Sequence, residues 1–206
     1  MSHSHNRGFT LVEIAIVIAI MALLLAAVVK GQSLLRGSET QDILATAKDL
    51  SAAVQAFKER YHYLPGDFPV DQATPEIASV STACRIGGSN AGNGNGRISD
   101  AESYCATEHL IRAGFIRGNP DATDPKDMLR SRYGLIRIIA ANDPTVHVSG
   151  FPASAMNLVE MENIPCDTAM SIALKIDTGQ LQTGAKVRAS VATCPEGSSL
   201  YLAFAL

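Results

Sequence analysis

The chain has 206 residues, enough for one modest domain and too few for two full domains on a long stem. Its 17 Lys and Arg against 20 Asp and Glu give a net charge of -3, and no basic tract is long enough to follow a phosphate backbone. Nucleic acid is therefore not an evident partner. The hydrophobic content of 47% is concentrated near the N-terminus, and the chain after residue 29 has the composition of a soluble domain.

The first predicted element is an apolar helix over residues 9–29, FTLVEIAIVIAIMALLLAAVV. Its 21 residues contain one charge, Glu13, and at about 1.5 Å per residue they span about 31 Å, the thickness of bilayer hydrocarbon. A cleaved secretory signal would have a shorter apolar run without a carboxylate near its start. A plain transmembrane anchor leaves Glu13 unexplained, because a carboxylate costs about 2.5–3.5 kcal/mol at mid-bilayer.

Residues 7–13 offer an explanation for this carboxylate. The heptapeptide Arg-Gly-Phe-Thr-Leu-Val-Glu resembles the prepilin signature of type IV pilins and type II secretion pseudopilins. In that family a membrane peptidase cleaves after the glycine, which is Gly8 here, and methylates the new N-terminal amine, which is on Phe9. The fifth mature residue is glutamate, which is Glu13. Since the amine is a cation near neutral pH, it gives Glu13 a partner in the same subunit or in a neighbour.

The resemblance also implies a location and partners. It implies a single-pass precursor in the bacterial inner membrane, with a leader peptide over residues 1–8 in the cytoplasm and the head in the periplasm. The implied partners are a prepilin peptidase, an inner-membrane assembly platform, and copies of itself or other pilins. The assembled product would be a periplasmic or cell-surface filament.

The periodicity of apolar residues continues the helix beyond the membrane segment. From Ile43 onward they recur at helical spacing, and we expect one helix from Phe9 to His62. Residues 9–29 would cross the membrane or enter a filament core, and residues 30–63 would support a head over residues 64–206. The sequence Leu-Pro-Gly-Asp at 64–67 ends the helix, because the residue before proline avoids the helical region and Pro-Gly favours a turn. We therefore predict an α+β fold of the pilin-like lollipop type, with a long N-terminal helix packed against a small antiparallel sheet.

The head is expected to mix loops, short helices and strands. Residues 71–98 are predicted to form a long loop, because they are rich in Ser, Ala, Gly and Asn. Two helices are predicted, one from Ser99 to Ala113 with Gly114 as its stop, and one over residues 167–175. Strands are predicted over residues 133–140, 186–194 and 200–206.

Residues 91–102 admit two interpretations. They place four side chains with oxygen atoms at positions 3, 5, 9 and 12 of an EF-hand calcium loop, namely Asn93, Asn95, Ser99 and Glu102. Position 1 is alanine, which offers no side-chain oxygen. Ser99 and Glu102 also form a capping-box pattern at a helix start, which is the simpler interpretation. We expect no cofactor, and calcium binding by these four residues is the alternative to the capping box.

The four cysteines are Cys84, Cys105, Cys166 and Cys194. They form no Cys-x-x-Cys motif and lack a histidine at metal-ligand spacing, which favours disulfides in an exported domain over a zinc site. Three pairings are allowed. We prefer Cys84 with Cys105 and Cys166 with Cys194, because each closes a loop within one part of the chain. Four reduced thiols are expected if the head is cytosolic.

Catalysis has little support in the sequence, which contains no nucleophile elbow and no Walker loop, and we expect no enzymatic activity. His62 and His109 are expected at helix edges in solvated or capping roles, and Asp100 and Glu102 in the first turn of a helix. The resemblance points to a structural subunit, a pilin or minor pilin of a type IV pilus-like filament. The alternative is a pseudopilin of a type II secretion system, and a filament-tip binding module is a further alternative.

Overall fold

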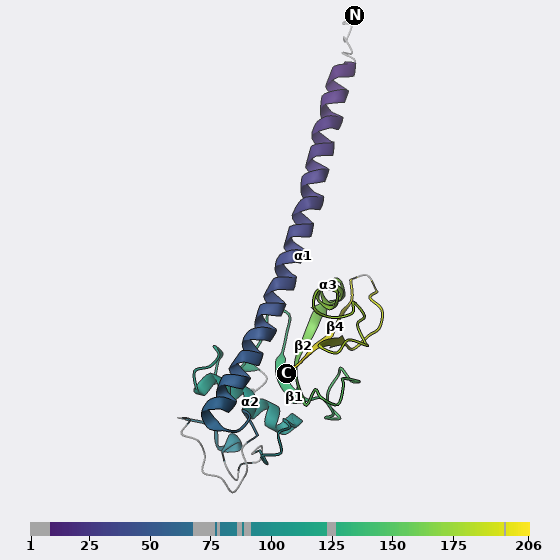
Figure 1. The fold of residues 1–206 in the computed structure, drawn as a ribbon. Coiled ribbons are helices and arrows are strands. Elements are labelled where there is room, and N and C mark those ends of the chain that lie inside the picture. The colour runs from purple at the N-terminus through teal and green to yellow at the C-terminus, as the bar shows by residue number, and fades with distance from the viewer. Residues whose placement is uncertain are drawn as a thin grey trace, which may run out of the picture. The chain divides into compact units, whose positions relative to one another are not determined.

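The computed structural model describes residues 9–67, 77, 79–85, 88, 92–122, 127–195 and 197–206. The chain forms two compact units, Met1–Gln41 and Asp42–Leu206. Helix α1 (Leu11–Tyr61) supplies the described part of the first unit and continues into the second. The long helix expected from Phe9 to His62 is thereby confirmed. Figure 1 follows the chain from the purple start of α1 to the yellow C-terminus.

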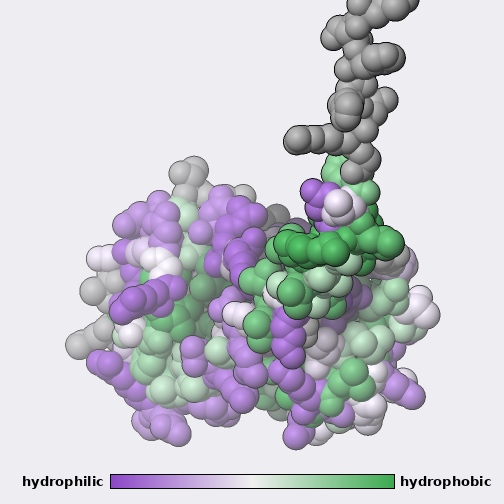
Figure 2. Space-filling view, turned by 90° about the horizontal axis from the view of Figure 1, so that it is seen from above, coloured by the Kyte–Doolittle hydropathy of each residue, from purple (hydrophilic) through white to green (hydrophobic). Residues whose placement is uncertain are grey.

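The first part of α1 is apolar on every side. Its aliphatic side chains are exposed around the whole circumference, and Phe9 and Leu11 are 85% and 89% exposed. Figure 2 looks down the helix from above and shows the hydrophobic colour of its own residues. With a mean hydropathy of 3.0 over its most apolar stretch, α1 is long and apolar enough to cross a membrane. Such a surface requires lipid or other helices as its surroundings.

Among the described residues, the second unit contains one antiparallel sheet of four strands in the order β1-β2-β4-β3, of which β1, β2 and β4 are labelled in Figure 1. The strands are β1 (Ile136–Ala140), β2 (Asn157–Pro165), β3 (Val187–Ala189) and β4 (Ser199–Ala205). Three correspond to the predicted strands, although β3 is much shorter than expected. The sequence pattern predicts no strand over β2, the longest of the four. This is an error whose reason is chemical: Glu160, Glu162, Asn163 and Pro165 are poor strand formers, yet β2 lies in the sheet interior.

Three helical elements accompany the sheet. The 3-10 helix η1 (Thr82–Cys84) precedes α2 (Asp100–Arg112), and α3 (Cys166–Ile176) follows β2 directly. The predicted capping box is present, because the Ser99 side chain accepts from the backbone of Glu102 while the Glu102 carboxylate accepts from the N–H of Ser99. The helix expected from Ser99 to Ala113 is thus confirmed as α2.

One face of the sheet forms the main core of the second unit. Ile138, Val159 and Leu202 from the sheet are fully buried in one cluster with Phe57 of α1 and Leu110 of α2. The opposite face is partly covered by the loop between β1 and β2. Val148 of that loop is buried with Leu158 and Ala203 in a smaller cluster. Arg137 of β1 and Glu160 of β2, which are paired in the register and joined by an ion pair, make another part of this face polar.

Candidate functional site

Helix α1 begins with a capping box that involves Glu13. Oε2 of Glu13 accepts hydrogen bonds from the backbone N–H of Thr10 at 2.8 Å and from its hydroxyl at 2.9 Å. In return, the Thr10 hydroxyl accepts from the backbone N–H of Glu13 at 3.2 Å. These bonds satisfy donors that a helix N-terminus otherwise leaves open. The predictions from the sequence do not include Thr10, although Thr-x-x-Glu is the same pattern that indicates the start of α2.

In the part of the chain that the structure describes, one oxygen of this carboxylate makes hydrogen bonds and the other makes none. Within the described residues, Oε2 of Glu13 makes all of its hydrogen bonds and Oε1 has no protein partner. A carboxylate can accept about four hydrogen bonds, so Glu13 can cap its own helix and still accept from a second group. Gly8 lies outside the described residues, whereas Phe9 is exposed directly before Thr10. The arrangement therefore suits an ammonium group at Phe9, or one from another subunit.

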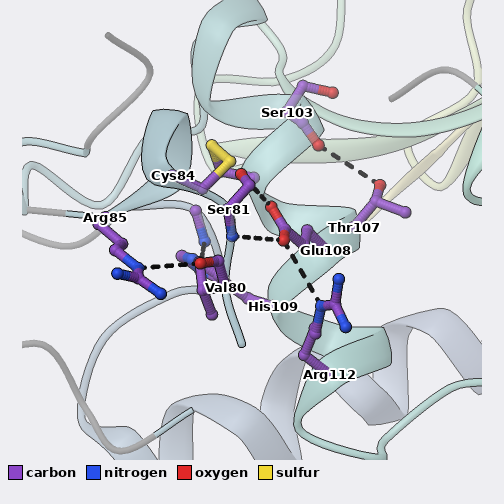
Figure 3. Close-up of a disulfide and its surroundings, with 11 residues drawn as sticks. Val80, Ser81, Cys84, Arg85, Ser103, Thr107, Glu108, His109 and Arg112 are labelled. Carbon is purple, nitrogen blue, oxygen red and sulfur yellow. Dashed lines mark hydrogen bonds and ion pairs between the residues drawn. A yellow bond between two sulfur atoms is a disulfide. The ribbon is translucent and has the colours of Figure 1, made fainter. Parts of the chain in front are cut away.

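The cysteines form two disulfides in the second unit. Cys84 of η1 is bonded to Cys105 of α2, and Cys166 at the start of α3 is bonded to Cys194. This is the pairing preferred from the sequence. Figure 3 shows the first bridge with its surroundings, where Glu108 of α2 accepts from both the backbone N–H and the hydroxyl of Ser81 at 2.7 Å. A covalent bond and a buried carboxylate thus attach η1 to α2.

His109 has a different environment from the one predicted. It is 1% exposed, so the expected solvated or capping role at a helix edge is wrong. Its Nδ1 accepts the backbone N–H of Gly66 at 2.9 Å, and its ring lies parallel to that of Phe57 at 6.3 Å. Burial lowers the pKa of His109 to about 4, against the opposing effects of a hydrogen bond to the Cys84 backbone and the charge of Glu108. His62 lies exposed directly after α1.

The loop before α2 encloses a carboxylate. Asp67 is 2% exposed, and its Oδ1 accepts the backbone N–H groups of Asn93, Gly94 and Asn95 at 3.2, 2.6 and 3.3 Å. Its Oδ2 accepts the N–H of Gly96 at 2.7 Å. The turn at residues 64–67 is therefore tied to the Asn-Gly loop by four bonds to one anionic group. Nothing in the local sequence pairs these two segments.

The four residues predicted as calcium ligands use their side-chain oxygens in hydrogen bonds to groups nearby in the chain. The side-chain oxygens of Asn93 and Asn95 accept backbone N–H groups two residues ahead, at 3.0 and 2.7 Å. Ser99 and Glu102 bond to each other in the capping box. Among the described residues, no group of three or more His, Cys, Asp or Glu is arranged to hold a metal ion. Calcium binding through the asparagine, serine and glutamate oxygens stays an untested prediction.

The N-terminal geometry agrees with one comparison against known proteins. Residues 3–29 match the model of the prokaryotic N-terminal methylation motif. This segment is the signature of type IV pilins and pseudopilins, and it contains Gly8, Phe9 and Glu13, so the resemblance seen in the sequence is confirmed. No curated protein and no solved structure matches the chain. The head must therefore be interpreted from its own residues.

Proposed function

We propose that this pilin-like precursor is a structural subunit, a pilin or minor pilin, of a type IV pilus-like filament. The observation that carries the proposal is Glu13: within the methylation motif, on a helix exposed and apolar all round, it keeps one carboxylate oxygen without a protein partner among the described residues. A prepilin peptidase would cut after Gly8 and methylate the amine of Phe9. The methylated amine remains a cation, so processing creates the charge that Glu13 can neutralise.

The apolar surface explains how such a subunit could change its surroundings. Lipid tails are as apolar as aliphatic side chains, so transfer of α1 from a bilayer to a bundle of like helices changes its hydrophobic free energy little. The packing between helices and the few polar groups must then determine whether subunits assemble and how neighbouring helices are aligned along the filament axis. In this chain Glu13 is the only charged residue between residues 9 and 29, so a pair between Glu13 and the Phe9 amine of a neighbour would fix the axial stagger.

The alternative is a pseudopilin of a type II secretion system, because the matched motif is common to both classes. In both cases we expect a precursor in the bacterial inner membrane, with its head exported to the periplasm, where disulfides form. Deletion of the gene separates them. Loss of surface fibres with normal secretion supports the pilus, whereas failed secretion without a fibre defect supports the pseudopilus.

Two substitutions of Glu13 test the proposal. Glu13→Ala removes the charge and the cap, while Glu13→Gln removes the charge and retains an oxygen that can accept from Thr10. If the charge pair drives assembly, both variants are inserted and processed normally but form few filaments, as counted by shearing and electron microscopy. If Glu13→Gln assembles like the unchanged protein, the carboxylate acts only as a helix cap and the pairing mechanism is wrong.

A further inference from the structure

The polar part of the sheet's second face forms the floor of a cavity of about 760 Å³. Its lining lies entirely within the second unit, between residues 100 and 201. Strands β1, β2 and β4 supply the floor, while α2, residues 127–130 and the loop between β1 and β2 supply the walls. The volume lies in the range of pockets that take small ligands or a side chain with its flanking residues.

A buried ion pair fixes the floor. Glu160 is 2% exposed and accepts from Nε of Arg137 at 2.7 Å and from the second guanidinium nitrogen at 2.6 Å. Its other oxygen accepts the backbone N–H groups of His147 and Val148 at 2.7 and 3.2 Å. Arg137 also donates to the Thr145 carbonyl at 2.6 Å. Because both charged groups are saturated by protein partners, they hold the wall loop in place and are not free to bind a ligand.

Other carboxylates at the cavity retain open acceptor atoms. Asp100 receives Arg137 on Oδ1 at 3.1 Å, Asp127 receives Arg130 on Oδ1 at 2.8 Å, and Glu162 receives the Leu135 N–H on Oε1 at 2.8 Å. The second oxygen of each has no partner among the residues that the structure describes. Three carboxylates that line one cavity therefore each have an unused acceptor atom.

Charge and aromatic character favour a cationic occupant. Four carboxylates and two guanidinium groups line the cavity, which gives these six side chains an excess of two negative charges. Tyr104 and Tyr201 also line it, and the ring of His147 lies parallel to that of Tyr201 at 3.8 Å. Aromatic rings attract organic cations, while the carboxylates would repel an anion. A single metal ion would leave most of this volume unfilled.

We propose that this cavity binds an organic cation, a guanidinium or primary ammonium group carried on the side chain of a partner polypeptide. The open oxygens of Asp127 and Glu162 accept its N–H groups, and the tyrosines flank its alkyl stem. The proposal does not depend on filament assembly, because every residue that it uses belongs to the head. It gives the head a binding role that the N-terminal motif does not describe.

The test uses the full chain in detergent micelles at low salt. The probe is the blocked tripeptide acetyl-Gly-Arg-Gly-amide, and its binding is measured by saturation-transfer NMR, which detects affinities around the expected millimolar range. The same peptide with citrulline is a neutral isostere. Putrescine represents a free polyamine, and calcium chloride represents a metal. The variant pair Glu162→Gln and Asp127→Asn removes the two charges while keeping an acceptor oxygen at each position.

The matched control is the pair Asp49→Asn and Glu59→Gln, two exposed residues of α1 within the second unit. It changes the net charge equally and lies outside the cavity. We expect the arginine peptide to bind at least about fivefold more tightly than the citrulline peptide, the cavity variant to weaken it about tenfold, and the control to change it less than about twofold.

Equal binding of the arginine and citrulline peptides overturns the proposal without any variant, so a folding defect cannot obscure the result. An equal loss in the control variant also overturns it, because it would show attraction to net charge alone. Binding of putrescine or calcium without binding of the peptide would assign the cavity to a free cation and would reject the polypeptide partner.

Discussion

Replacing Gly66 by Ala tests how closely the turn after α1 approaches α2. Gly66 has a φ of +83°, and a Cβ atom built on it would lie 2.5 Å from the Glu102 carbonyl oxygen and 2.8 Å from the Ala106 nitrogen. Both contacts are with backbone atoms of a helix, which cannot rotate away as a side chain can. The turn or the helix would have to move, and the hydrogen bond from Gly66 to His109 would be strained with it.

The magnitude follows from two separate costs. An L-residue at this φ costs roughly 1–2 kcal/mol, and forcing a methyl group into a packed contact costs roughly 1–3 kcal/mol more. We expect Gly66→Ala to lower the free energy of unfolding of the head by about 3 kcal/mol in total. Gly114 is the matched control, because its φ is +79° and nothing lies within 4 Å of its built Cβ. Gly114→Ala should lower the free energy of unfolding by about 1 kcal/mol, because only the cost of an L-residue at positive φ applies there.

The assay is thermal unfolding of the full chain, followed by near-ultraviolet circular dichroism of tyrosine. The chain has five tyrosines and no tryptophan, and every tyrosine lies at residue 61 or later, so this signal reports on the second unit. A domain of this size loses roughly 2–4 °C in Tm per kcal/mol, which gives about 9 °C for Gly66→Ala and about 3 °C for Gly114→Ala. Equal shifts would refute the close approach of the turn to α2.

Three further predictions concern a histidine, a disulfide and the helix start. The pKa of His109 is about 4 in the folded chain and 6.5 in the unfolded chain, so the unfolded state binds more protons between these pH values. The free energy of unfolding should therefore fall by about 3 kcal/mol as the pH drops from 6.5 to 4. Denaturant unfolding of the His109→Gln variant should not show this loss. Replacing Cys84 and Cys105 by serine should cost about 3 kcal/mol by chemical denaturation, since the bridge closes a loop of 21 residues; an unchanged midpoint would contradict this. Thr10→Val should speed amide hydrogen exchange of Glu13 by about fivefold or more, whereas Thr10→Ser should not.

The features that the sequence predicts well depend on neighbours along the chain. The apolar run, the periodic stripe of α1 and the capping box of α2 are each determined within one or two helical turns. The preferred disulfide pairing also follows from short loops. Thr10 belongs to this group, because Thr-x-x-Glu signals its role as plainly as Ser-x-x-Glu does for α2.

The features that it misses depend on contacts between distant segments. The interior strand β2 contains Glu160, whose charge argues against a buried strand until Arg137 of β1 is placed beside it. His109 is a polar residue of α2, and the sequence therefore places it at a helix edge. Its burial follows only from the packing of Phe57 and the turn at Gly66 against it. Asp67 is enclosed by a loop that lies about 30 residues further along the chain. Local patterns do not contain these pairings.

In the proposed mechanism, processing after Gly8 creates the charge that Glu13 neutralises. Its most direct test is mass spectrometry of the N-terminal peptide of the protein isolated from its own membranes. We expect the mature chain to begin at Phe9 and to carry a methyl group on its amine. An intact leader peptide, or a chain cleaved at the end of the apolar run in the manner of a secretory signal, would contradict this mechanism.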